Sequence, residues 1–207
     1  MANEGTIEIR RIERARLKIR VAGTAPLIVH RFDEKAKGMM LDAMQGRKKA
    51  KEIRDPQADF ERAMHRLDGD RYGFPATGFK AATVYAARYF GKSVSITLLK
   101  QALFVSGEGP DMLVPLETGE PKMREDIVRI GMGTTDLRYR PMFDPWGAVL
   151  DVTYLPSLLA RDSVLALVEA GGMGGVGEWR PSSKSSATGV YGTYSIDETF
   201  EVQEIKA

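Results

Sequence analysis

A glycine-rich segment near the end of the chain carries residues suited to contact a polyanion. It reads GGMGGVGEWRPSSK from Gly171 and places Gly174, Gly175 and Gly177 just before Trp179, Arg180 and Lys184. Glycine lets a backbone approach a partner closely, an indole ring stacks on bases, and cationic side chains pair with phosphates. The spacing differs from a Walker P-loop, since Lys184 lacks the preceding glycine and no helix is expected after it. A plain connection between a helix and a strand remains the alternative.

A second candidate lies in FPATGFKAATVYAAR, where Lys80 falls in the first turn of an expected helix and Arg88 follows two turns later. A cation in the first turn opposes the helix dipole, so Lys80 needs a local reason. One reason is an anion at the helix N-terminus, whose N–H groups favour phosphate. Solvent exposure at little cost is the other.

Further cations recur along the chain. The run GRKKAKEIR is the densest, and it is either a solvated helix or a phosphate-binding segment. Single candidates stand at the end of the first strand and on a later hairpin. These candidate nucleic-acid contacts are Arg47, Lys48, Lys49, Lys51, His30, Arg31, Arg138 and Arg140.

Evidence for catalysis is thin. Asp126, Asp136 and His30 have side chains suited to acid–base chemistry, yet isolated acids are usually surface residues. The chain has no cysteine and two histidines, which disfavours thiolate and multi-histidine metal sites. We therefore predict no catalytic residue, no metal and no cofactor; no strand–helix–strand unit surrounds the glycines to form a dinucleotide site.

The expected elements form one α+β domain over residues 1–207. Leu17, Ile19 and Val21 alternate with cations, the pattern of a half-buried strand. A basic helical insertion is expected at 32–70, a helix at 78–90 with Thr77 as N-cap, and a strand-like stretch at 93–107. A hairpin insertion follows at 112–144, then a strand, a helix at 162–170 capped by Asp162, and a last strand. Without the insertions the order is βαββαβ, the ferredoxin-like (RRM-like) palm.

The composition indicates a globular protein. Hydrophobic residues make up 43% of the 207 residues and charged residues 28%, with a net charge of +2. So small a charge does not by itself indicate a nucleic-acid binder, and the placement of the cations matters instead. The first residues are charged, without the apolar stretch of a secretory signal, and no apolar run is long enough for a membrane span. We expect a cytoplasmic protein of a bacterial cell with no membrane partner.

The segment YGFPATGFKAATVYAARY resembles the Pro/Ser-Lys-Arg segment of RAMP-superfamily proteins, which include the Cas7-like backbone subunits of CRISPR effector complexes. GGMGGVGEWR is similar to the glycine-rich loop that those proteins place between the second helix and the final strand. The whole chain also looks like small proteins encoded by phages and prophages. The resemblance implies that Lys80 and residues 174–180 face RNA and that the inserted hairpin acts as a thumb.

These observations predict a non-enzymatic protein that binds single-stranded RNA or DNA and forms head-to-tail homo-oligomers along the strand. It would serve in phage recombination or annealing, or as a CRISPR-like backbone subunit. Two alternatives stay open. One is a RAMP-type endoribonuclease that uses His30 or Asp136, and the other is a phage structural or host-interaction protein without a nucleic-acid role.

Overall fold

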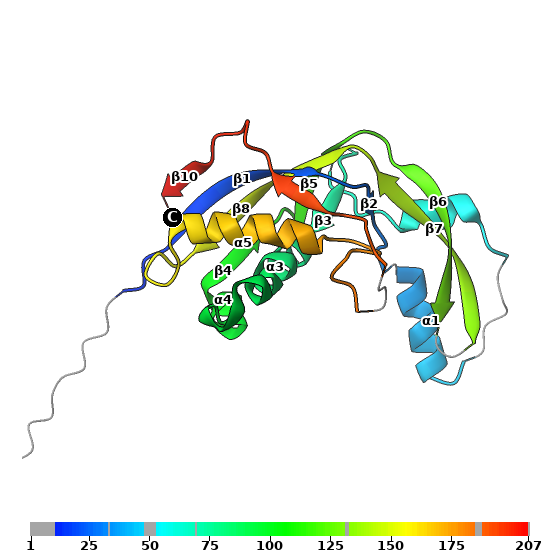
Figure 1. Ribbon diagram of the computed structural model, residues 1–207. Helices are drawn as coiled ribbons and strands as arrows, with labels where there is room; N and C mark the ends of the chain where they lie inside the picture. The colour runs from blue at the N-terminus through cyan, green and yellow to red at the C-terminus, as the bar shows by residue number, and fades with distance from the viewer. Residues whose placement is uncertain are drawn as a thin grey trace, which may run out of the picture.

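The computed structural model describes residues 11–32, 34–47, 53–68, 70–130, 133–184 and 188–206. A twisted antiparallel sheet forms the body of the molecule, with helices against one of its faces (Figure 1). A smaller three-stranded sheet extends from one end of this body.

The main sheet is built around two long neighbouring strands, β1 (Ala15–Gly23) and β8 (Trp146–Tyr154). Shorter strands pair on either side or lie at the edge. They are β3 (Gly73–Pro75), β4 (Leu103–Ser106), β5 (Leu113–Thr118), β9 (Tyr194–Ile196) and β10 (Gln203–Lys206). Strands β9 and β10 both pair with β1, whereas β4 and β5 both pair with β8.

The strand order confirms the predicted ferredoxin-like fold. Taken as palm strands, β1 comes first, β4 with β5 second, β8 third, and β9 with β10 last. Across the sheet, β9 and β10 lie beside β1, β1 lies beside β8, and β8 lies beside β4 and β5, which is the order 4-1-3-2. Every pair is antiparallel. This is the arrangement that βαββαβ connections produce when both helices cover one face.

The helical layer consists of α3 (Ala76–Tyr85), the 3₁₀ helix η1 (Ala86–Ser93), α4 (Ile96–Ala102) and α5 (Arg161–Gly174). Helices α3 and α5 pack closely because Gly171 faces the backbone of α3. A Cβ at Gly171 would lie 3.0 Å from backbone atoms of Ala82 and Thr83. The core lies between these helices and the sheet, where the alternating Leu17, Ile19 and Val21 of β1 are fully buried.

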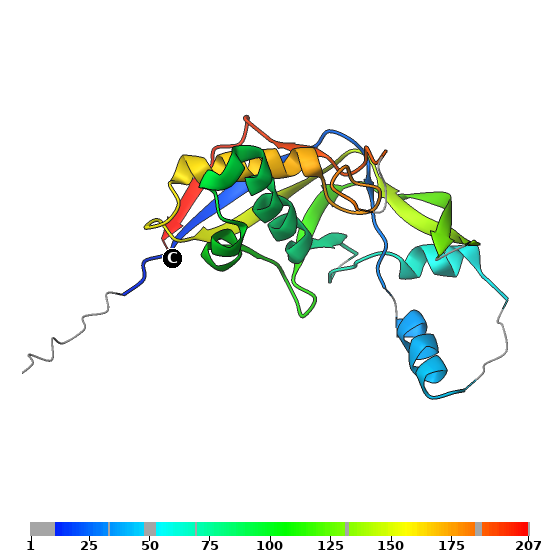
Figure 2. The ribbon, with the colours of Figure 1, turned by 60° about the horizontal axis from the view of Figure 1, so that its bottom comes forward.

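The hairpin of β6 (Lys122–Ile130) and β7 (Thr134–Phe143) forms the second sheet together with β2 (Leu27–Ile28). The range 112–144, expected as an insertion, thus contains this hairpin and also β5, which pairs with β8 in the palm. The range 32–70 contains α1 (Glu34–Met44) and α2 (Pro56–Arg62). Helix α2 packs on β7, whereas α1 stands apart from the body (Figure 2).

Three local predictions were wrong. Residues Ile96–Ala102, expected as part of a strand, form α4, which Ser95 caps by accepting a hydrogen bond from the Leu98 N–H. Helix α3 begins before Thr77, so Pro75 occupies its N-cap position. Helix α5 continues past Gly171 to Gly174, and its N-cap is Ala160 rather than Asp162. In α5 the packing of glycines against α3 and β9 outweighs their low intrinsic helix propensity.

Within the described residues, no helix is long and apolar enough to cross a membrane.

Candidate nucleic-acid interface

The described residues of the glycine loop, 175–184 and 188–192, fold back on the chain itself. Gly175, Gly177 and Gly192 have φ angles of 68°, 77° and 67°, which L residues rarely adopt. A Cβ at Gly177 would lie 2.5 Å from the carbonyl oxygen of Ile28, and the Val176 N–H donates to Gly192 O at 2.9 Å. Gly174 and Gly175 are buried. The close approach that these glycines permit is therefore to the protein's own backbone.

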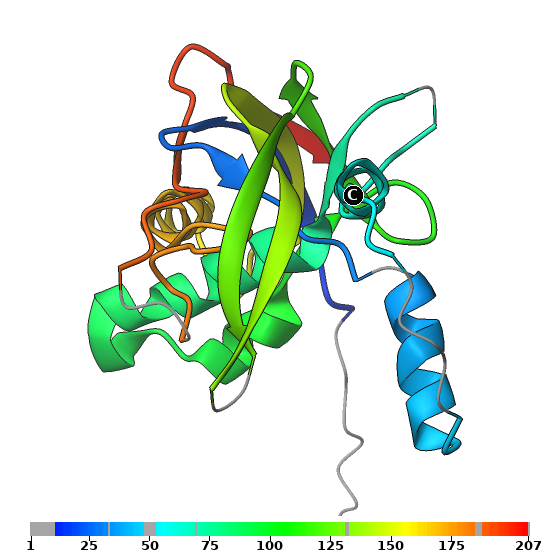
Figure 3. The ribbon, with the colours of Figure 1, turned by 90° about the vertical axis from the view of Figure 1, so that its right-hand side faces the viewer.

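The glycine loop lies beside the β6–β7 hairpin (Figure 3), and Trp179 of this loop contacts Arg124 of β6. The Arg124 guanidinium of β6 stands 4.9 Å from the Trp179 ring centroid and 4.9 Å from that of Tyr191. Arg124 also donates to Asp126 Oδ1 at 2.7 Å and to the Tyr191 hydroxyl at 3.0 Å. Trp179 is partly exposed and has a φ of 53°. The junction thus presents two aromatic rings and a guanidinium.

Arg140 lies beneath this junction, 5.8 Å from the Trp179 ring centroid, with a side chain only 3% exposed. Its Nη1 lies 3.5 Å from Asp126 Oδ2 and its Nη2 3.3 Å from Glu178 Oε2. Burial lowers the pKa of Arg140 from its ordinary value, and the carboxylates of Glu178 and Asp126 oppose that shift. Asp126 is as deeply buried as Arg140. The pair forms a charged core under the hairpin.

His30 and Asp136 meet through Arg138. The Arg138 Nη1 lies 3.1 Å from His30 Nε2, and its Nε donates to Asp136 Oδ2 at 3.4 Å. Asp136 also accepts from Arg54 Nη1 at 2.7 Å. Burial would raise the pKa of Asp136, but the bonds and charges of Arg54 and Arg138 lower it overall.

Two cations accompany Trp179 in the loop. Arg180 is partly buried and donates from Nη1 to the carbonyl oxygen of Gly177 at 2.7 Å, which closes the turn that carries Trp179. Lys184 is exposed. The predicted Trp179, Arg180, Arg138 and Arg140 thus gather around the loop–hairpin junction.

Lys80 contacts α4 and β4. Its Nζ donates to the carbonyl oxygen of Lys100 at 2.9 Å, at the end of α4, and lies 4.1 Å from the Phe104 ring centroid. Burial lowers the pKa of Lys80. Arg88 is exposed, with its guanidinium 5.1 Å from the Tyr85 ring centroid. A local reason for a lysine in this first turn is therefore the end of α4, where free carbonyls favour a cation.

The remaining candidates lie on the helical insertion or beside it. Arg31 forms an ion pair with Asp111 at 3.7 Å, and Arg47 forms one with Asp42 at 3.9 Å. Lys48, Lys49 and Lys51 lie outside the described residues.

Four residues of the junction escaped the sequence-based site prediction: Arg124, Asp126, Glu178 and Tyr191. Asp126 was considered only as a catalytic acid. A signal for Arg124 does exist, because a hairpin folded about Gly131–Gly133 pairs Arg124 with Arg140 and Asp126 with Arg138. Directly opposed residues share a face, so these side chains must meet. Nothing in the sequence indicates that Tyr191 reaches the same place.

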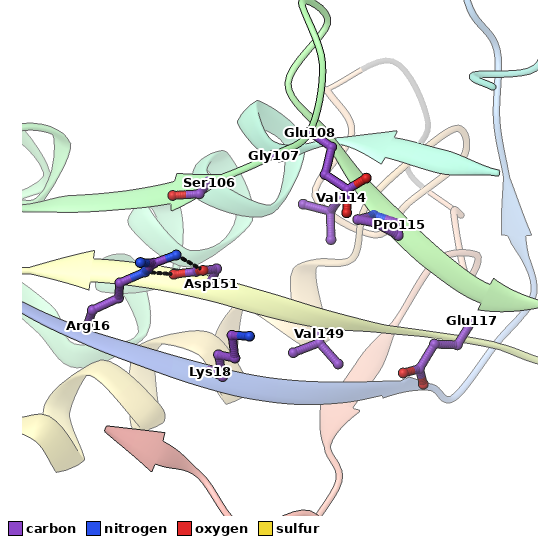
Figure 4. A pocket seen from close by; sticks show the side chains of 10 residues that line it. All are labelled: Arg16, Lys18, Ser106, Gly107, Glu108, Val114, Pro115, Glu117, Val149 and Asp151. Carbon is purple, nitrogen blue, oxygen red and sulfur yellow. Dashed lines mark hydrogen bonds and ion pairs between the residues drawn. The ribbon is translucent and has the colours of Figure 1, made fainter. Parts of the chain in front are cut away.

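The open face of the palm sheet offers a contrast. A cavity of about 370 Å³ there is lined by Arg16, Lys18, Glu117 and Asp151 among others (Figure 4). Arg16 is paired with Asp151 and Arg20 with Glu117. Lys18 forms no ion pair within the part of the chain that the structure describes. Among those same residues, no group of three or more acidic or histidine side chains is placed to hold a metal ion.

No family model and no curated protein matches the sequence. Among solved structures, the chain is similar to the crystal structure of Cmr6 from Pyrococcus furiosus, with 11% identity and a TM-score of 0.45 over 90% of this chain and 100% of that one. It is also similar to a chain in a cryo-EM structure of the Type III-B Cmr-beta bound to cognate target RNA. There the identity is 9% and the TM-score 0.43, over 94% of this chain and 61% of that one. The strand order and connections described above define the fold.

Proposed function

We propose that this protein binds single-stranded nucleic acid without cleaving it, and that it binds RNA at least as tightly as DNA. One observation carries the proposal: the hairpin and the glycine loop, far apart in sequence, bring Arg124, Trp179 and Tyr191 together, partly exposed, at one junction of a ferredoxin-like palm. Aromatic rings with guanidinium groups are the groups that stack on unpaired bases and pair with phosphates.

In this proposal Trp179 stacks on a base, and Arg124, Arg138 and Arg180 meet the backbone. The motif resemblance to RAMP proteins points to the same loop. Gly174, Gly175 and Gly177 act by shaping the turn that presents Trp179, since their own surfaces face Ile28, Ser182 and Gly192. Lys184 and Arg47 extend the path of the strand, and Lys80 and Arg88 are outer contacts on the helical layer. Lys48, Lys49 and Lys51, which lie outside the described residues, are proposed contacts by residue type alone.

The proposed head-to-tail assembly needs two different surfaces on each subunit. Helix α1 offers one, because Met40, Leu41 and Met44 are 57%, 54% and 85% exposed. The palm helices offer another, where Tyr89 and Met173 are largely exposed. Contiguous exposed apolar side chains commonly mark interaction sites. Met44→Glu should therefore lower the sedimentation coefficient of the protein bound to RNA, because the assemblies become smaller, while leaving the monomer folded.

The endoribonuclease is the alternative that a specific observation favours, since Arg138 joins His30 and Asp136. His65 offers no second acid–base histidine near neutral pH, because burial lowers its pKa to about 4. Incubation of the protein with labelled single-stranded RNA, with and without Mg²⁺, separates the two functions. If the protein cleaves RNA specifically and His30→Ala abolishes the cleavage, the endoribonuclease function replaces the proposal of binding without cleavage.

The test of binding is fluorescence anisotropy with labelled oligouridine and oligothymidine over a range of salt concentrations. Several phosphate contacts should make affinity fall steeply with salt, with a slope of about 0.7 per contact for a single strand. RNA should bind at least as tightly as DNA. Absence of binding to both at low salt would remove the proposal and favour a structural or host-interaction role.

A further inference from the structure

Arg140 is held loosely for a buried cation. Its contacts with Asp126 and Glu178 are 3.5 and 3.3 Å, whereas charge-assisted hydrogen bonds of guanidinium groups are usually about 2.7–2.9 Å. Its Nε and Nη1 are buried and donate no hydrogen bond within the described residues. The guanidinium is thus incompletely satisfied, and Nη2, which faces Glu178 at 3.3 Å and is not among those buried unpaired atoms, is the donor that can gain from a better acceptor.

Glu178 covers the outer edge of this guanidinium. Its side chain is 37% exposed, so its carboxylate reaches solvent while Oε2 faces Arg140 Nη2. Its backbone is fixed, because the Glu178 N–H donates to the Ile28 carbonyl oxygen at 2.8 Å. The carboxylate can therefore leave Arg140 by side-chain rotation alone.

We propose that Glu178 occupies a phosphate-binding position on Arg140 and competes there with the backbone of the bound strand. The inference rests on the proposed function and deepens it. Carboxylate and phosphate oxygens accept hydrogen bonds from a guanidinium with the same geometry. A phosphate oxygen that replaces Oε2 contacts Nη2 while Arg140 stays buried beneath Trp179.

The competition has a direct consequence for affinity. A strand that uses Arg140 must first displace a carboxylate, and the displaced charge stays close enough to repel the phosphate. Trp179 follows Glu178 directly, so one short turn sets both the stacking ring and the competing charge. Only a strand whose other contacts with the protein are strong enough to displace the Glu178 carboxylate would therefore bind Arg140.

The test compares Glu178→Gln with Glu117→Gln. Glutamine keeps the size of the side chain and removes the charge. Glu117 is a matched control, since it is similarly exposed and pairs with Arg20 at 2.8 Å, on the open face of the sheet. With labelled oligouridine, Glu178→Gln should bind about tenfold more tightly, the scale of one charge-assisted hydrogen bond, with a steeper salt dependence. Glu117→Gln should bind like the wild type.

The outcomes separate the two proposals. If the wild type binds no single strand at low salt, the proposed function fails. If it binds and the two variants have equal affinities, the competition is wrong and binding stands. Glu178→Asp, which keeps the charge but withdraws it from Arg140, should show part of the gain and serves if the glutamine variant does not fold, as checked by thermal unfolding. Affinity of Glu178→Asp equal to the wild type would also contradict the competition.

Discussion

Two faces of the molecule carry arginines on β-strands beside carboxylates, yet they differ in what lies above them. On the open face, the side chains of Arg16 and Arg20 are 40% and 39% exposed and pair with Asp151 and Glu117. At the loop–hairpin junction, Arg124 lies 4.9 Å from the ring centroids of both Trp179 and Tyr191, and Arg140 is buried. The difference comes from the glycine loop, which covers the hairpin.

The comparison shows that a basic strand pattern does not define a binding surface by itself. Exposed ion pairs contribute little to stability, about 0–1 kcal/mol each, and their charges largely cancel. At the junction, the buried Arg140 and the partly exposed Arg124 lie beside aromatic rings, so their charges are less screened by water than those on the open face. We therefore expect substitutions at the junction to have large effects and equivalent substitutions on the open face to have small ones.

The largest effect is expected for Arg140→Met. It removes a buried charge and leaves Asp126 with Arg124 as its remaining guanidinium partner. Breaking a buried pair costs about 3–5 kcal/mol when the remaining charge is left without a partner, and because Asp126 keeps Arg124 at 2.7 Å we expect the lower end, about 3 kcal/mol. Arg16→Met on the open face should cost about 0–1 kcal/mol. Urea unfolding measures both, and equal losses would show that burial does not distinguish the two faces.

The next largest effect is expected for Gly177→Ala, which should lower the free energy of unfolding by more than about 2 kcal/mol. A left-handed conformation costs a non-glycine residue about 1–2 kcal/mol, and the new Cβ would also press on Ile28 O. Gly109→Ala is the control, since its φ of 66° is similar and nothing lies within 4 Å of its Cβ position. Thermal or urea unfolding of both isolates the contact with Ile28. A smaller loss of unfolding free energy for Gly177→Ala than for Gly109→Ala would mean that the loop shifts to accommodate the Cβ without a large energetic cost.

Trp179→Ala should weaken binding of oligouridine by about 1–3 kcal/mol, the usual scale of a base–aromatic stack. Phe104→Ala, which removes a ring that is 47% exposed beside Lys80, should leave the affinity unchanged. Anisotropy measures both variants once their folding has been verified by circular dichroism. The reverse ranking would move the stacking site to the palm's edge.

The smallest effect concerns single cations. Lys184→Ala should reduce the slope of log affinity against log salt by about 0.7, the value of one phosphate contact in a single strand. Lys18→Ala, on the open face, should leave the slope as it is. A change for Lys18 alone would place the strand on the open sheet face, as in RRM domains.

Much of the fold was determined by the sequence. Alternation in β1 predicted which residues are buried, and the order of strand-like and helical stretches predicted the ferredoxin-like topology. Local errors arose where short apolar runs are ambiguous, as in Ile96–Ala102, or where packing extends a helix through glycines, as in α5. Periodicity reports which side is buried but not how far a helix continues.

The site was determined only in part. Residue types identified Trp179, Arg180, Arg138 and Arg140 as candidates, because their chemistry suits nucleic acids wherever they lie. The sequence could not show that Lys80 binds the end of α4, or that Arg124 contacts both Trp179 and Tyr191. Those contacts join segments far apart in the chain, and only the packing of the glycine loop against β2 and the hairpin places them together. From the sequence, the glycines were expected to let a ligand approach the backbone. In the structure, Gly175 and Gly177 instead let the loop pack against the backbone of Gly192 and Ile28, and this packing brings the cations and rings to one junction.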